Sequence, residues 1–333
     1  MIGSTSVTIN RRTLIAGVVG GTLGITATQS AFADKATAPD SSVKPVVWLN
    51  MNQQELDDAY DQTKYAPNAS IVINRYSTNS EETTKRLGEP SYFSYGPTAA
   101  ERCEIYPTTK PNAPILIYIH GGAWLITKAK DYRFPAEAII NAGAHYVILD
   151  FTTVTATGGD LMPLAEQTRR AVAWVAKNAA RFGGDPNRIY ICGHSSGGHL
   201  GGVVVSTDWK EYGAPPDVVK GAVLVSGMYD LKPVRLSSRS RYLNLTDETE
   251  HALSAQRHLA SINCPITLVY GSFETPEFQR QSRDFAAALS AAGRHVTLNV
   301  VKEYNHFEVV ESLANPYGAV GRATLSMMRL GTP

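Results

Sequence analysis

The sequence predicts a three-layer α/β fold, in which helices cover both faces of a mostly parallel central sheet. Short apolar, β-branched segments recur along the chain and, in its second half, alternate with amphipathic helical segments. The apolar segments are apolar on both faces, which is typical of parallel strands buried on each side. With 333 residues, of which 43% are hydrophobic and 18% charged, the chain is long enough to bury a deep core.

Turn residues separate the expected strands, which span residues 102–106, 115–119, 146–151, 189–192, 222–225, 266–270 and 296–301. Helices are predicted over 162–180 and 276–292, because apolar side chains recur there on one face at a spacing of 3.6 residues. Gly293 stands where a helix C-cap is expected. No hinge rich in proline, glycine or serine divides residues 70–333, which we therefore expect to form one domain.

Residues 1–33 have the pattern of a cleavable export signal. Arg11 and Arg12 precede an uncharged segment rich in glycine and alanine, which ends in Ala31-Phe32-Ala33. The paired arginines indicate the twin-arginine type and a periplasmic or secreted location. Four glycines make residues 13–33 a poor spanning helix, so we favour cleavage over an uncleaved anchor and expect no stable membrane insertion afterwards. Residues 34–69 are then expected to be a linker and a helical segment.

Charge and cysteine content exclude several function classes. The 31 basic and 30 acidic side chains give a net charge of +1, so no basic surface for nucleic acid is expected. Neither C-x-x-C nor H-E-x-x-H occurs, and we predict no metal site. Among the three cysteines, Cys192 is expected to be a buried strand residue, whereas pairing of Cys103 with Cys264 stays open.

Ser195 is the candidate nucleophile. It lies at the centre of Gly193-His194-Ser195-Ser196-Gly197, between a predicted strand and a Leu/Val-rich helical segment. In this strand–turn–helix context, G-x-S-x-G forms a strained turn that exposes the serine hydroxyl. Gly193 and Gly197 are expected to keep Cβ atoms out of the crowded flanks of the turn.

A second glycine-rich turn is the candidate oxyanion hole. The strand 115–119 ends in His120-Gly121-Gly122-Ala123-Trp124, the H-G-G type of loop that presents backbone amides to an acyl oxygen. We expect the amides of Gly122 and Ala123 to act together with that of Ser196. His120 is expected to hold the loop by a hydrogen bond.

Serine needs a base and an orienting acid, which follow it in the order serine, acid, histidine in this type of arrangement. His306 follows the last strand and is the candidate base; His295 precedes that strand, on the wrong edge, and His251 and His258 are expected to be solvated. Glu274 follows the strand 266–270 and is the candidate acid. The alternatives for the acid are Asp230 and Glu277.

At these residues the sequence resembles the hormone-sensitive-lipase-like branch of the α/β-hydrolases, and more closely the kynurenine formamidase (arylformamidase) and carboxylesterase group. The resemblance spans about residues 50–330, and its motifs lie at 55–60, 120–124, 193–200, 226–233, 274–282 and 305–307. It implies the α/β-hydrolase fold and the roles of nucleophile, acid and base for Ser195, Glu274 and His306.

The sequence departs from this group at two sites. Glu274 stands where Asp is usual, and residues 151–158 replace a Tyr-x-Leu-x-Pro pattern expected near the pocket mouth. Four apolar residues, each with core packing as the alternative, are expected to line the pocket: Trp124, Met228, Tyr229 and Phe307.

Together these features predict an exported serine hydrolase that needs no cofactor and cleaves small esters or activated amides through an acyl-enzyme. The alternative is an arylformamidase acting on N-formyl aryl amides such as N-formylkynurenine. The export signal favours the esterase, because tryptophan breakdown is cytosolic. A non-catalytic binding protein on the same scaffold is a more distant alternative.

Overall fold

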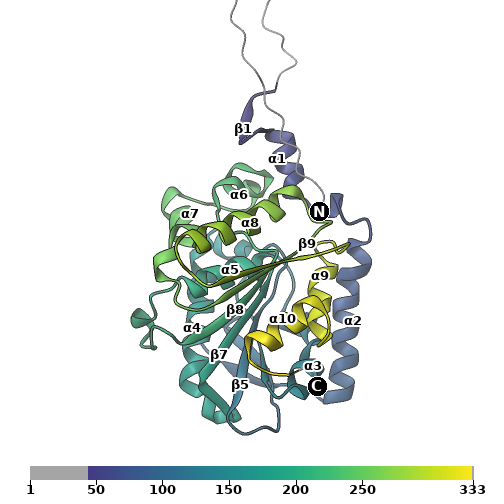
Figure 1. The fold of residues 1–333 in the computed structure, drawn as a ribbon, viewed down its shortest axis with the longest axis vertical. Coiled ribbons are helices and arrows are strands. Elements are labelled where there is room, and N and C mark those ends of the chain that lie inside the picture. Colours follow the sequence, from purple (N-terminus) through teal and green to yellow (C-terminus); the bar gives the residue numbers. More distant parts are fainter. Residues whose placement is uncertain (1–43, 332–333) are drawn as a thin grey trace, which may run out of the picture. The chain divides into compact units, whose positions relative to one another are not determined.

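The computed structural model describes residues 44–331, which form one compact unit (Figure 1). The predicted export signal over residues 1–33, and the residues up to 43, lie outside this described part. No helix within residues 44–331 is long and apolar enough to span a bilayer.

An eight-stranded sheet runs through the unit in the order β10-β9-β8-β7-β5-β6-β4-β3. Only β4 runs against the direction of the other seven strands, so that it pairs antiparallel with both β3 and β6. The strands are β3 (Ser91–Ser94), β4 (Arg102–Tyr106), β5 (Ala113–Ile119), β6 (His145–Leu149), β7 (Gly184–His194), β8 (Val219–Val225), β9 (Ile266–Gly271) and β10 (Val296–Val301). All seven predicted strands are present, whereas β3 was not predicted.

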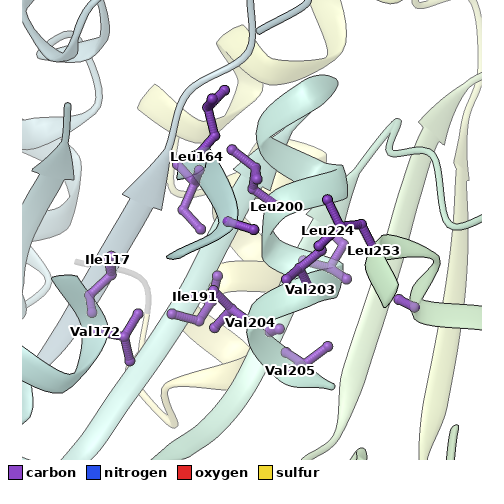
Figure 2. Packing of buried hydrophobic residues seen from close by; sticks show 14 of the residues in the cluster. Ile117, Leu164, Val172, Ile191, Leu200, Val203, Val204, Val205, Leu224 and Leu253 are labelled. Atoms are coloured by element: carbon purple, nitrogen blue, oxygen red, sulfur yellow. The ribbon is translucent and has the colours of Figure 1, made fainter. Parts of the chain in front are cut away.

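The sheet separates two apolar cores, as a three-layer fold requires. Along β5, Ile117 and its alternate neighbours face one core, while Leu116 and Tyr118 face the other. The first core contains side chains of α4 (Met162–Asn178), α5 (Ser196–Val205) and α8 (Pro276–Ala291), and Figure 2 shows its packing around α5. The second contains side chains of α2 (Ala69–Leu87), α3 (Ala136–Asn141), α9 (Glu308–Glu311) and α10 (Ala319–Met327). The predicted three-layer α/β fold is therefore confirmed.

The N-terminal segment is part of the body, and no structural boundary falls at residue 70. A short hairpin, β1 (Val46–Trp48) and β2 (Met51–Asn52), leads into α1 (Gln53–Ala59), which starts with a capping box between Asn52 and Glu55. Leu56 and Tyr60 are buried in the first core. Since these side chains are buried only by packing against the sheet and its helices, residues 44–69 belong to the same domain as the sheet. The chain also forms α6 (Lys232–Leu236) and α7 (Asp247–Leu253).

The cysteines do not pair. Cys103 lies on β4 and Cys264 directly precedes β9, and both are free thiols. Five strand spacings separate these strands, which amounts to about 24 Å, whereas a disulfide needs Cα atoms within about 7 Å. Cys192 is fully buried in β7, as predicted.

The parallel arrangement determines where the functional loops meet. Strands β5, β7, β8, β9 and β10 run in the same direction, so their C-terminal ends share one edge of the sheet. The segments that follow these ends contain His120, Ser195, Ser226, Glu274 and His306. Residues far apart in sequence thus gather at one rim.

Candidate active site

Ser195 occupies the turn between β7 and α5 in a strained backbone conformation. Its φ of 58° and ψ of −122° are rare for a residue with a side chain. The turn leaves no room beside the serine: a Cβ on Gly193 would lie 2.3 Å from the carbonyl oxygen of Gly197, and one on Gly197 would lie 2.0 Å from that of Ile119. The expectation for the two glycines is therefore confirmed, and the hydroxyl stands free of the turn.

His306 connects the serine to the acid. Its Nε2 lies 2.9 Å from Oγ of Ser195, and its Nδ1 lies 3.0 Å from Oε2 of Glu274. All three residues are buried, so the two contacts are shielded from bulk water. The structure thus brings the predicted nucleophile, base and acid into one hydrogen-bonded line.

The carboxylate of Glu274 is fixed by further donors. Oε1 accepts hydrogen bonds from the hydroxyl of Ser226 at 2.6 Å and from the backbone amide of Gly271 at 2.7 Å. Oε2 is left for the imidazole of His306. The longer side chain of glutamate is thus accommodated with both oxygens occupied.

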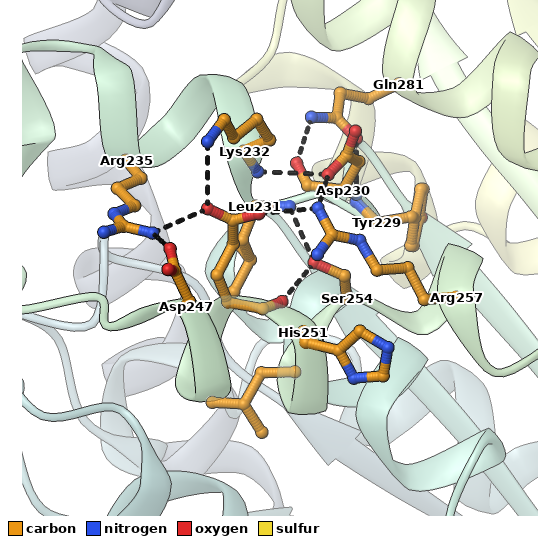
Figure 3. A network of polar contacts seen from close by, with 12 residues as sticks. Tyr229, Asp230, Leu231, Lys232, Arg235, Asp247, His251, Ser254, Arg257 and Gln281 are labelled. Carbon is orange, nitrogen blue, oxygen red and sulfur yellow. Dashed lines mark hydrogen bonds and ion pairs between the residues drawn. The ribbon is translucent and has the colours of Figure 1, made fainter.

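The rival acids lie in other networks. The carboxylate of Asp230 accepts from Arg257 at 3.1 Å and from the amide of Lys232 at 3.0 Å (Figure 3). Glu277 pairs with Arg280. Neither carboxylate contacts His306, so the geometry supports Glu274 among the three candidates.

The rival histidines are also placed elsewhere. The rings of His251 and His258 pack edge to face, and Nε2 of His258 donates to the carbonyl of His251. His295 directly precedes the N-terminal end of β10, whereas His306 follows its C-terminal end, where Ser195 lies. Only His306 among these four contacts Ser195.

The loop after β5 presents unpaired amides beside the serine. Gly122 and Ala123 have positive φ values of 98° and 56°, and no described residue accepts a hydrogen bond from either amide. Ser196 is the first residue of α5, where a helix leaves its amides without intrahelical partners. The amide of Trp124 donates to Oγ of Ser196 at 3.2 Å and joins this loop to the serine turn. The three amides predicted to bind an oxyanion are thus available.

His120 fixes the same loop through a hydrogen-bonded contact with Thr127. Its Nδ1 lies 3.1 Å from Oγ1 of Thr127, and that hydroxyl donates to the carbonyl of Gly121 at 2.9 Å. The imidazole stacks on Phe151, with ring centroids 4.3 Å apart, and burial lowers its pKa. His120 therefore has the structural role that the sequence predicted.

His194 supports the candidate base from the other side. Its Nε2 donates to the backbone carbonyl of His306 at 2.8 Å. Burial, followed by the nearby His306 ring, lowers the pKa of His194 well below the usual value. A neutral imidazole thus fixes the main chain that carries His306.

A cavity of about 250 Å³ opens over Ser195 and His306. Of the four predicted lining residues, only Phe307 borders it. Trp124 is buried and donates from Nε1 to Nδ1 of His199, whereas Met228 and Tyr229 are fully buried in the core. The prediction was wrong for these three, because their side chains point into the layer between sheet and helices. The segment 151–158 does not border the cavity either, since Phe151 packs under the loop on His120.

Sequence reasoning missed most of the cavity wall. The missed residues come from the N-terminal segment, α2, the loop after β5, the end of β7 and the turn after α6: Tyr60, Asp61, Gln62, Thr63, Ile73, Tyr76, Ile126, Thr127, Tyr132, His194 and Arg239. The resemblance around residues 55–60 was the one signal that pointed to the N-terminal part of this wall. Among residues 44–331, no cluster of three or more His, Cys, Asp or Glu side chains is arranged to hold a metal ion.

Comparisons with known proteins find hydrolases that are similar in sequence and in structure. The family described as BD-FAE matches residues 104–272. The kynurenine formamidase of Danio rerio is 31% identical over 84% of this chain and 98% of its own length. The carboxylesterase NlhH of Mycobacterium tuberculosis is 30% identical over 38% of this chain and 39% of its own. In structure, the Pyrobaculum calidifontis esterase covers 83% of this chain and 97% of its own, with a TM-score of 0.63 at 19% identity, which shows the shared fold.

Proposed function

Because the chain belongs to the α/β-hydrolases, in the group of kynurenine formamidases and carboxylesterases, we propose that it is a serine hydrolase of carboxylic esters or activated amides. One observation carries this proposal: the hydrogen-bonded line from Ser195 through His306 to Glu274 opens onto a cavity bordered by unpaired amides. Among the described residues that border the cavity, Ser195 is the only serine or cysteine.

The proposed reaction starts when His306 removes the proton of Ser195 and Oγ attacks the substrate carbonyl. The negative charge that forms on the carbonyl oxygen is stabilised by the amides of Gly122, Ala123 and Ser196, at about 3 kcal/mol for each donor. Protonated His306 then passes the proton to the leaving group. Water attacks the acyl-enzyme in the second half of the reaction, with His306 again as base.

The proposal is tested by covalent labelling with a fluorophosphonate. Wild-type protein should be labelled and should hydrolyse 4-nitrophenyl butyrate, because the reagent needs an activated serine. Ser195→Ala should abolish both signals, whereas Ser290→Ala, at an exposed position on α8, should retain both. Full labelling of Ser195→Ala would contradict the assignment of the nucleophile.

Arylformamidase activity is the second candidate, and one observation favours it. The kynurenine formamidases of Danio rerio and Salmo salar each match 84% of this chain, whereas the carboxylesterase match covers 38%. We rank ester hydrolysis first because the pattern in residues 1–33 favours export. A panel of aryl esters of rising chain length, run beside N-formylkynurenine and ranked by kcat/KM, separates the two. Preference for the formyl amide would reverse our ranking.

Export by the twin-arginine route remains a proposal about residues 1–33. Expression in a bacterial host followed by fractionation should place the mature protein in the periplasm or medium. Replacing Arg11 and Arg12 with lysine should retain it inside the cell with its N-terminus intact. Equal export of this double variant would refute the twin-arginine assignment.

A further inference from the structure

Arg239 is the only lysine or arginine side chain that borders the cavity among the described residues. It lies in the 3-10 turn Ser238–Arg241, directly after α6, and is half-buried. One terminal nitrogen donates to the hydroxyl of Tyr242 and the other to the carbonyl of Tyr60, each at 3.0 Å. A cation from a distant part of the chain therefore forms part of the wall around Ser195.

The positive charge of Arg239 has no acidic partner. No carboxylate of the described residues lies within ion-pair distance, and the buried Nε has no acceptor. Its surroundings are aromatic: the guanidinium carbon lies 5.7 Å from the ring of Tyr60, 5.8 Å from that of Trp124 and 5.9 Å from that of Phe278. Cation–π contacts offset part of the desolvation of a guanidinium but leave its charge uncompensated.

Among the described residues, the half-buried Arg188 and Arg294, which lie outside the cavity, also have no acidic partner, whereas two others are neutralised. Arg133 pairs with Glu104, and Arg280 pairs with Glu277, in each case with a buried carboxylate. Arg239 also keeps N–H groups that are not used, since each terminal nitrogen carries two and the structure assigns one bond to each. The cavity thus contains a charged, planar donor group whose usual partner is missing.

We propose that Arg239 binds a carboxylate of the substrate, so that the preferred substrates are esters or amides with a negative charge in the acyl or the leaving part. The inference rests on the proposed function, because it assigns the substrate class to the same cavity. A guanidinium suits this task, since its planar fork matches the two oxygens of a carboxylate. The aromatic rings around it restrict its orientation.

Asp61 limits where this carboxylate can lie. Among residues 44–331, it is the one acidic side chain bordering the cavity, and its Oδ1 accepts from the amide and the hydroxyl of Thr63. Like charges repel in a partly desolvated site, so the substrate carboxylate should lie on the side of Arg239 and away from Asp61. Asp61→Asn keeps a capping side chain and removes the charge.

The experiment compares charged and neutral substrates of equal length. The first series contains 4-nitrophenyl monoesters of succinic, glutaric and adipic acid, with 4-nitrophenyl esters of monocarboxylic acids as neutral counterparts. The second contains butyrate esters of 3- and 4-hydroxybenzoic acid and of their methyl esters, which moves the carboxylate into the leaving part. Values of kcat and KM are measured for wild type, Arg239→Gln, Arg239→Lys and Asp61→Asn, with thermal unfolding as the check on folding.

Wild type should prefer at least one carboxylate substrate to its neutral counterpart. Arg239→Gln should lower kcat/KM for that substrate by about 10- to 100-fold, mainly by raising KM. It should change kcat/KM for the neutral counterpart by less than about 3-fold. Arg239→Lys should restore part of the loss, and Asp61→Asn should leave the preference intact or increase it.

Two results would overturn the proposal. The first is that wild type prefers no carboxylate substrate. The second is that Arg239→Gln lowers kcat/KM equally for carboxylate and neutral substrates, which is the effect expected if Arg239 only stabilises the cavity wall. The first result needs no variant, so the test holds even where Arg239→Gln fails to fold. Failure of the proposed function is distinct, since fluorophosphonate would then leave wild type unlabelled.

Discussion

Replacing Glu274 with glutamine should disable the protein through the tautomer of His306. Oε1 accepts from the hydroxyl of Ser226 and the amide of Gly271, so the carbonyl oxygen of the new amide has to stay there. The amide NH₂ then faces Nδ1 of His306, which has to accept instead of donate. The proton consequently moves to Nε2, which faces Ser195 and can no longer take the proton of its hydroxyl.

The expected loss in kcat is about 10⁴-fold, the order of magnitude for a triad whose histidine is held in the wrong tautomer. This corresponds to about 5 kcal/mol of transition-state stabilisation. Because glutamine has the shape of glutamate, thermal unfolding should show a folded protein. Glu274→Asp withdraws the carboxylate by about 1.5 Å and should cost about 10²-fold instead.

The assay is hydrolysis of 4-nitrophenyl butyrate, with Asp230→Asn as the matched control. Asp230 bonds to Arg257 and to the amide of Lys232, and it should tolerate the amide with a change below about 3-fold. A nearly neutral Glu274→Gln together with a severe Asp230→Asn would refute the assignment of the acid.

Further predictions concern stability. Burial lowers the pKa of His199 to about 4, and its two nitrogens bond to Nε1 of Trp124 and the carbonyl of Leu253. An unfolded histidine titrates near 6.5, so the stabilisation is complete above about pH 6.5 and falls as pH is lowered towards about 4, by about 3 kcal/mol in total. Urea unfolding at several pH values measures how the free energy of unfolding depends on pH. His199→Gln, which retains a donor and an acceptor, should reduce this dependence, and an unchanged dependence would contradict its assignment to His199. Gly197→Ala places a Cβ 2.0 Å from a backbone oxygen, so we expect at least about 1–3 kcal/mol of destabilisation and loss of turnover, whereas wild-type turnover would show that the turn is not tight. Leu224→Ala should lower the free energy of unfolding by about 2–5 kcal/mol because Leu224 is fully buried (Figure 2). Leu298→Ala, on the exposed side of β10, should lower it by less than about 1 kcal/mol, and equal effects in urea unfolding would contradict the assigned core.

The elements that sequence reasoning found are those with a strong local signal. Strands β5 and β7 consist of continuous apolar segments, and the glycines at 193 and 197 mark a turn with little space. Helix α2 was missed because asparagine, serine and threonine dilute its apolar face, so that only five of its 19 residues are buried. Strand β3 is mostly exposed and has no apolar run that would predict it.

The sequence by itself determined the chemistry available to this protein, because nucleophile, base, acid and the glycine-rich loop lie in local contexts of strand ends and turns. Only the tertiary structure decided which side chains surround the substrate. Tyr60 and Arg239 lie 179 positions apart in the chain and meet at the cavity wall, while Trp124, Met228 and Tyr229 point into the core. The physical reason is that packing between layers sets the direction of a side chain, and no periodicity within one segment encodes what the opposite layer places against it.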